Sequence, residues 1–181
     1  NAAARKGSGA KSSDGASSGA GQNAYDFALT GSGDMLGMEG LAWGLGYGEA
    51  ENGSQDVTAA SQDMGDDEHM TAFANYTYGP VTFGYQMSHI HKGAPAGTDE
   101  TTDAWGLAWN VNENLSISYG EREVEYHNVS ADNITEDGEG IAIAYTMGSM
   151  KIAGNRNEVS NNGGTTGSND EMTEIALSFA F

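Results

Sequence analysis

Large apolar residues alternate with small or polar ones through most of this chain, and that period of two restricts the fold more than any other feature. In the segment 140–147, for example, Ile141, Ile143 and Tyr145 alternate with glycine and alanine. Successive side chains of a β-strand point to opposite faces, so the pattern predicts strands with one large apolar face. Nine segments carry it: 24–30, 41–48, 71–78, 81–88, 104–111, 115–120, 140–147, 150–153 and 172–181. Glycine recurs within them and argues against helices, because an interior glycine costs about 1 kcal/mol relative to alanine.

The connections between these segments come in two kinds, which alternate along the chain. The short ones are 31–36, 79–80, 112–114 and 148–149. The long, polar ones are 51–69, 92–102, 128–137 and 158–170. Short turns at one end and long loops at the other are typical of transmembrane β-barrels. We therefore predict an all-β, antiparallel, up-and-down transmembrane barrel.

The charge composition by itself suggests a different protein, an acidic soluble one. Asp and Glu number 26 against 7 Lys and Arg, for a formal net charge of −19. Such acidity excludes nucleic acid as a partner, since phosphate backbones are bound by Lys and Arg. The sequence has no Cys, which excludes a disulfide framework, thiolate zinc sites and a Cys nucleophile. It also has no run of about 18 apolar residues that would predict a transmembrane helix.

The distribution of the charges reconciles the acidity with a membrane barrel. We assign most of the acids to the long loops and their rims, and the middle of the predicted apolar face carries no charged residue. A Lys or Arg at the bilayer midplane would cost about 2–4 kcal/mol. The opposite strand face is rich in Gly, Ala, Ser and Thr, which suits the inside of a barrel. The acidity is thus predicted at the mouth of a pore.

The chain is predicted to have two parts. Residues 1–22 consist mainly of Gly, Ser, Ala and Asn and contain nothing able to form a core, so we expect a flexible loop remnant there. Residues 23–181 carry the predicted barrel strands.

Several segments resemble the alphaproteobacterial general porins. They are Tyr-Asp-Phe-Ala-Leu-Thr-Gly at 25–31, Ala-Asn-Tyr-Thr-Tyr-Gly-Pro at 74–80, Ala-Trp-Gly-Leu-Ala-Trp-Asn at 104–110 and Gly-Ile-Ala-Ile-Ala-Tyr-Thr-Met-Gly at 140–148. The segment 175–181, with Leu177, Phe179 and Phe181 on one face, resembles the C-terminal strand that the barrel-assembly machinery recognises in bacterial outer-membrane proteins.

The resemblance implies a water-filled channel of the bacterial outer membrane through which small hydrophilic solutes and ions diffuse. It implies a barrel of about sixteen strands, of which this chain holds the last nine, assembled as a homotrimer among outer-membrane lipid and lipopolysaccharide. Residues 1–22 would then be the remnant of an outward-facing loop. The inward-folded loop that narrows the pore in this family lies between earlier strands, so it would be absent from this chain.

Strand parity predicts which polar residues face the pore. They are Asp26, Gln86, Arg122, Lys151 and Glu174. General porins set basic wall residues opposite acidic ones, and the resemblance makes Arg122 and Lys151 the candidates for the basic side. A second interpretation pairs Arg122 with its neighbours Glu121 or Glu123. Because acids surround the predicted mouth, we expect mild cation selectivity.

Two other functional classes are considered. An outer-membrane enzyme would draw on His89, His91 and Asp103, but no nucleophile or acid pair at a defined spacing supports catalysis. A soluble calcium-binding β-protein would need repeated glycine-rich nonapeptides, which the sequence lacks. The His-x-His pair and the acidic cluster 66–68 are potential ligands, and the cluster is expected to bind Ca²⁺ or Mg²⁺ weakly at most. We therefore expect no catalytic residue, no resident metal and no cofactor.

Overall fold

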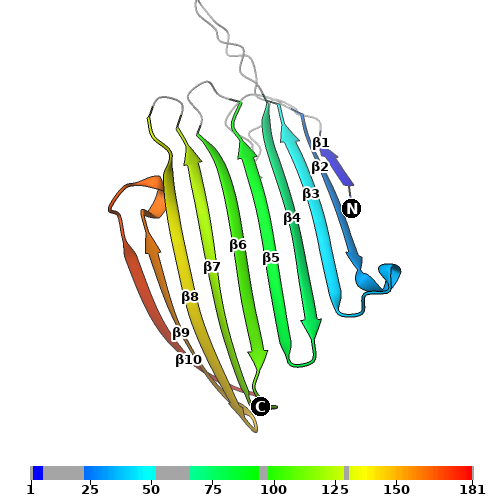
Figure 1. The fold of residues 1–181 in the computed structure, drawn as a ribbon, viewed down its shortest axis with the longest axis vertical. Helices are drawn as coiled ribbons and strands as arrows, with labels where there is room; N and C mark the ends of the chain where they lie inside the picture. Colours follow the sequence, from blue (N-terminus) through cyan, green and yellow to red (C-terminus); the bar gives the residue numbers. More distant parts are fainter. Residues whose placement is uncertain (1, 6–22, 52–65, 94–97, 129–130, 181) are drawn as a thin grey trace, which may run out of the picture.

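A computed structural model describes residues 2–5, 23–51, 66–93, 98–128 and 131–180 of the chain. They form one antiparallel sheet whose strands lie in the order of the sequence (Figure 1). The strands are β1 (Ala2–Arg5), β2 (Ala24–Ser32), β3 (Leu41–Ala50), β4 (Asp67–Tyr78), β5 (Val81–His91), β6 (Asp99–Asn110), β7 (Leu115–His127), β8 (Ile134–Met147), β9 (Met150–Ser160) and β10 (Asp170–Phe179). Two short 3-10 helices, η1 (Gly33–Leu36) and η2 (Asn162–Gly164), lie in connections. Within the described ranges, no helix is long and apolar enough to cross a membrane.

The nine predicted strands are present as β2 to β10, which confirms the all-β, up-and-down fold. Most of them extend further toward the long connections than the sequence pattern indicated. The β7–β8 pairing, for instance, continues through Glu123 opposite Asp137 to Tyr126 opposite Ile134. Backbone ladder bonds do not depend on apolar side chains, so polar residues that keep the alternation can remain in the sheet.

The prediction for residues 1–22 was wrong at one point. Ala2–Arg5 forms the short strand β1, which pairs with residues 24–27 of β2. The ladder needs only backbone donors and acceptors, so a segment without a large apolar side chain can extend the sheet. Residues 6–22 lie outside the described part of the chain.

The two ends of the sheet differ in the connections they carry. At the turn end, β4 and β5 are joined through Gly79-Pro80, and β8 and β9 through Gly148-Ser149. The strand ends that precede and follow the longer connections, such as the end of β3 and the start of β4, lie together at the opposite end of the sheet, the loop end (Figure 1). The predicted separation of short turns from long loops is therefore present in the fold.

The two faces of the sheet differ in side-chain size, and the face that carries the large apolar side chains is the more exposed one. In β8, Ile141 and Ile143 are 52% and 51% exposed, whereas Gly140, Ala142 and Ala144 on the opposite face are half-buried. We call the first the apolar face and the second the small-residue face. Among the described residues other than glycine, Val124 and Glu136 alone are classed as buried.

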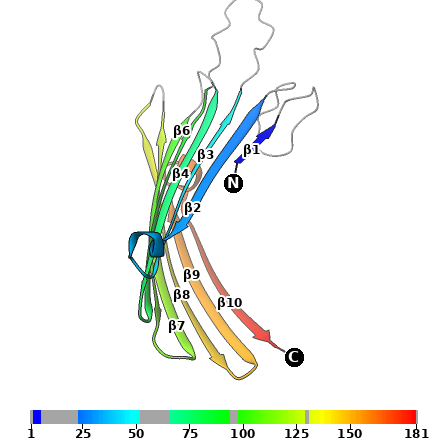
Figure 2. The same cartoon turned by 90° about the vertical axis from the view of Figure 1, so that its right-hand side faces the viewer.

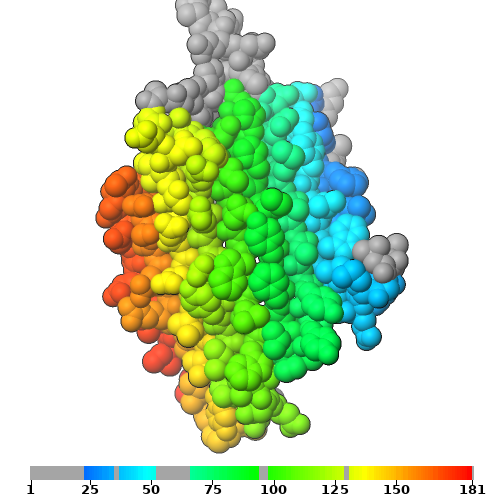
Figure 3. Space-filling model, viewed as in Figure 1, coloured from blue at the N-terminus to red at the C-terminus, as the bar shows by residue number. Residues whose placement is uncertain are grey.

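The sheet is curved, with β1 and β10 bending to the same side (Figure 2). The broad hollow of the molecule is lined by side chains of the small-residue face, among them Phe73, Asn75, Gln86, Ser118 and Asn157. The small-residue face is therefore the concave one. The convex side is seen in Figure 3, where the side chains of β5 to β8 lie beside one another without another segment over them.

Glycine on the small-residue face makes room for the few larger side chains there. A Cβ at Gly44 would lie 2.3 Å from Cε1 of Phe73 on the neighbouring strand. The Phe73 ring thus lies over the backbone of β3 at Gly44. A substitution at Gly44 would push that ring into the hollow.

Candidate channel wall

The five predicted pore-facing residues all share the small-residue face. Asp26 pairs with Gly48, Gln86 with Ala104, and Arg122 with Ala104 from the other side. At the edge of the sheet formed by β9 and β10, Lys151 pairs with Ser178 and Glu174 pairs with Asn155. The register thus agrees with the parity used to choose them, and their role in a pore stays a prediction.

The structure does not bring these five together in one site. Arg122 lies in the loop-end half of β7, and Lys151 lies one residue from the Gly148-Ser149 turn. Glu174 accepts a hydrogen bond of 3.4 Å from Nδ2 of Asn155. Among the described residues, Lys151 has no ion-pair partner. Charged groups are therefore spread along the hollow from one end to the other.

Arg122 forms an ion pair that the sequence did not indicate. Its Nη2 donates to Oε1 of Glu136 on β8. Glu121 and Glu123, the alternative partners, lie on the apolar face, because adjacent strand residues point in opposite directions. Spacing alone could not identify Glu136, since the contact joins residues on different strands.

Glu136 is the most buried polar residue of the described chain, at 3% exposure. Oε2 accepts the backbone N–H of Gly163 at 2.7 Å and the hydroxyl of Tyr126 at 3.3 Å. Together with Arg122, these donors satisfy a carboxylate that would be costly to bury unpaired. The sequence pattern placed Glu136 in the long, polar connection 128–137, so it was not among the predicted site residues.

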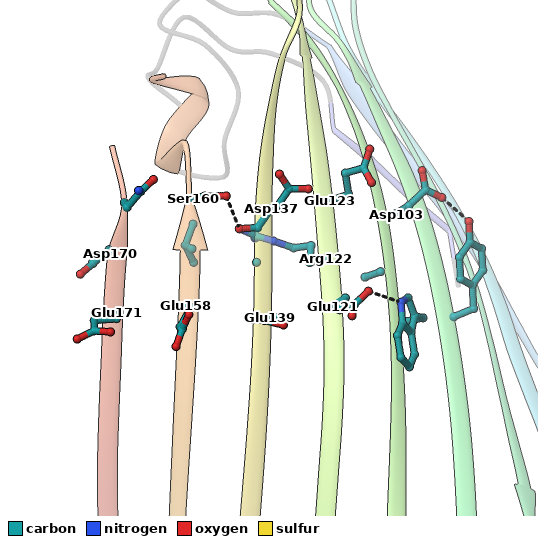
Figure 4. A pocket seen from close by; sticks show the side chains of 16 residues that line it. Asp103, Glu121, Arg122, Glu123, Asp137, Glu139, Glu158, Ser160, Asp170 and Glu171 are labelled. Atoms are coloured by element: carbon teal, nitrogen blue, oxygen red, sulfur yellow. Dashed lines mark hydrogen bonds between the residues drawn. The ribbon is translucent and has the colours of Figure 1, made fainter. Parts of the chain in front are cut away.

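A belt of carboxylates crosses the apolar face toward the loop end of the strands. Figure 4 shows Glu121, Glu139, Glu158 and Glu171 side by side on four successive strands. The sequence analysis expected such acids in the long loops or at their rims. They lie on the strands because the ladder continues past the last large apolar residue of each strand.

Tyrosine and tryptophan side chains of the apolar face donate hydrogen bonds to carboxylates on the same face. The hydroxyl of Tyr119 donates to Glu121 at 2.6 Å and to Glu139 at 2.8 Å. Nε1 of Trp105 donates to Glu121 at 3.1 Å (Figure 4). Tyr47 donates to Glu49 at 2.6 Å. Amphipathic rings whose polar atoms point away from an apolar band are typical of membrane interfaces.

A short sequence signal could have located the belt. Tyr-Gly-Glu occurs at 47–49 and again at 119–121. In a strand, the first and third residues share a face, so the motif places a hydroxyl beside a carboxylate.

The histidine pair lies on the apolar face near the loop end rather than in the hollow. Nδ1 of His91 is 2.9 Å from Oδ2 of Asp99, and Nδ1 of His89 is 3.1 Å from Oγ1 of Thr101. His91 is the last residue of β5, beyond the apolar band, and its hydrogen bond to Asp99 raises the pKa of its imidazole. Asp103 instead accepts the hydroxyl of Tyr85. The three residues of the enzyme hypothesis therefore have separate partners.

No cluster of three or more His, Asp or Glu side chains in the described ranges has a geometry that would hold a metal ion. Asp67 and Glu68 of the acidic cluster lie on opposite faces of β4 and so do not converge. Weak binding of Ca²⁺ or Mg²⁺ at the acidic loops stays a prediction.

The residues proposed as the assembly signal are partly described. Leu177 and Phe179 lie on the apolar face of β10 at 55% and 54% exposure. Phe181 lies outside the described residues.

No protein-family model and no curated protein sequence matches the chain. Among solved structures, the chain is similar to in-vitro folded OmpT, an outer membrane protein of Vibrio cholerae, with a TM-score of 0.62 and 11% identity over 89% of this chain and 56% of that one. It is also similar to a loop L8 deletion mutant of OmpT, with a TM-score of 0.64 and 13% identity over 88% of this chain and 54% of that one. The fold is that of an outer-membrane β-barrel. The chain spans about half the length of the solved structures it matches.

Proposed function

We propose that this chain forms part of the wall of an outer-membrane porin, similar to the alphaproteobacterial general porins. Small hydrophilic solutes and ions would diffuse through its water-filled channel. The mechanism involves size exclusion and electrostatic selection with no covalent step, so the protein is not an enzyme and needs no cofactor.

The observation that carries this proposal is the inverted exposure of the two faces. In β8 the large side chains of Ile141 and Ile143 are about half exposed on the convex face, while small residues line the concave face. A water-soluble sheet buries its large apolar side chains. A lipid environment makes the observed arrangement favourable, and a polar concave face then borders water.

Cation selectivity follows from the charges of the small-residue face. On this face of strands β2 to β10, carboxylates outnumber cations: Asp26, Asp67, Glu100, Glu136, Asp170 and Glu174 against Arg122 and Lys151. A pore wall with excess negative charge raises the local concentration of cations.

The proposed partners follow from the same arrangement. The apolar band is suited to outer-membrane lipid, and the carboxylate belt lies where lipopolysaccharide head groups would be met. Further strands would complete the sheet to a closed barrel, since an open edge in lipid leaves backbone groups unpaired. We also propose assembly into a homotrimer and recognition of the last strand, with Leu177 and Phe179, by the barrel-assembly machinery.

The test is reconstitution of the complete protein into a planar lipid bilayer. We expect stepwise, ohmic conductance in KCl and a reversal potential of cation-selective sign in a salt gradient. Heating should shift its electrophoretic mobility, as unfolding of a barrel does. Absence of channels from protein that shows this shift would overturn the porin proposal, and an anion-selective potential would overturn the selectivity.

A further inference from the structure

The connection between β9 and β10 is folded against the small-residue face. We call the segment 161–169 the strap; η2 lies within it, next to the ends of β8 and β9 (Figure 1). Its glycines 163 and 164 contact Glu136 and Tyr126 on the sheet. Both residues belong to the small-residue face, since Tyr126 pairs with Ile134 and Glu136 with Val124. The strap therefore occupies space on the concave side of the sheet.

Internal hydrogen bonds give the strap a defined shape. The N–H of Asn162 donates to the carbonyl of Ser168 at 2.7 Å, and that of Gly167 donates to Oδ1 of Asn161 at 2.9 Å. Asn161 has a left-handed backbone conformation with φ of 52°, which reverses the chain directly after β9. The segment is thus a compact loop that can act as one unit.

Two adjacent residues of β8 attach the strap to the sheet. Nδ2 of Asn161 donates to the carbonyl of Thr135 at 2.9 Å. The N–H of Gly163 donates to Oε2 of Glu136 at 2.7 Å. The second bond is charge-assisted and lies at a buried carboxylate, so it is the stronger of the two.

The ring of Tyr126 completes the contact. A Cβ at Gly164 would lie 2.9 Å from Cγ and Cδ2 of Tyr126, so only glycine allows the strap backbone to approach the ring this closely. Tyr126 in turn donates its hydroxyl to Glu136 at 3.3 Å. Glu136 therefore joins β7, β8 and the strap through Arg122, Tyr126 and Gly163.

We propose that Glu136 fastens the strap across the small-residue face and that the fastened strap sets the width of the channel at its loop end. Glu136 is then a specificity-determining residue for solute size. The part of this proposal that concerns channel width rests on the proposed channel function. The fastening itself is a property of the fold.

The first test is Glu136→Gln in the complete protein, which keeps the size of the side chain and removes its charge. Hydrogen exchange of the strap amides should become about tenfold faster or more, because the bond to Gly163 loses its charge assistance. Single-channel conductance should rise by about 1.5- to 3-fold, together with a larger solute exclusion limit. Glu123→Gln is the matched control, since Glu123 pairs with Asp137 beside Glu136 but lies on the apolar face, so the substitution should change neither readout.

A second variant tests the same contact in case Glu136→Gln misfolds around the buried pair of Arg122 and Glu136. Asn161→Gly keeps the left-handed backbone accessible and removes both side-chain bonds of Asn161 without touching Glu136. It should also accelerate exchange in the strap and raise the conductance.

The outcomes distinguish the fastening of the strap from its effect on channel width. Unchanged exchange in both variants overturns the fastening. Faster exchange with unchanged conductance overturns the role in channel width. If the wild-type protein conducts nothing, the proposed function fails, and hydrogen exchange still decides whether Glu136 holds the strap.

Discussion

The two faces of this sheet use the same residue type, glutamate, in opposite ways. On the apolar face, Glu121, Glu139 and Glu158 form an exposed row that is neutralised partly by Arg156, with Nη2 at 2.7 Å from Glu158. On the small-residue face, Glu136 is buried and bonded to two side chains of β7 and to a backbone N–H of the strap. The first arrangement suits an interface with ions and head groups. The second suits a structural joint, because a buried carboxylate is stable only with fixed partners.

The largest expected effect is the loss of stability when an arginine is placed in the middle of a strand on the apolar face rather than on the small-residue face. Ile143→Arg places a charge on the apolar face and should destabilise the folded barrel by about 2–4 kcal/mol in lipid. Its neighbour provides the control: Ala144→Arg points into the hollow and should fold with normal stability, at the expense of conductance. Chemical denaturation in liposomes measures both. Equal destabilisation by the two substitutions would mean that the apolar face does not contact lipid.

A smaller effect compares the two arginines of the carboxylate pairs. Arg122→Met leaves the buried Glu136 without its cation and should destabilise the protein by about 1–3 kcal/mol. Arg156→Met leaves only exposed carboxylates and should cost about 0–1 kcal/mol. Thermal unfolding in detergent micelles provides the measurement. If Arg156→Met proves the more damaging, burial of Glu136 does not govern the stability of this region.

These comparisons show which features were accessible from the sequence. The nine strands β2 to β10, their order in the sheet and the two faces followed from alternation, because a period of two directly reports which side of a strand a residue occupies. The five pore-facing candidates share one face of the sheet for the same reason, and their role in a pore stays a prediction. Parity carries no information about distance along the barrel axis or about contacts between strands far apart in sequence.

The features that the sequence did not predict depend on contacts between segments far apart in sequence. Glu136 was predicted in a loop because it falls in the long, polar connection 128–137, before the apolar alternation that begins at Gly140. Its burial depends on the strap, which returns to β8 from residues 161–169. Ala2–Arg5 was assigned to a loop because backbone pairing at a sheet edge leaves no side-chain pattern. Both cases involve hydrogen bonds to the backbone rather than side-chain packing.

The smallest expected effect tests whether charge selection depends on the face as well as on the total charge. Lys151→Met removes a cation from the small-residue face near the turn end, where no described side chain pairs with it. The wall then becomes more negative, so the cation-to-anion permeability ratio should rise by about 1.5-fold. Arg156→Met removes the same charge from the apolar face and should leave the ratio unchanged, since the backbone of the sheet would separate that site from the proposed pore. Reversal potentials of the two variants in one salt gradient supply the comparison. Equal shifts would show that net charge alone controls selectivity, and a shift confined to Arg156→Met would reverse the assignment of inside and outside.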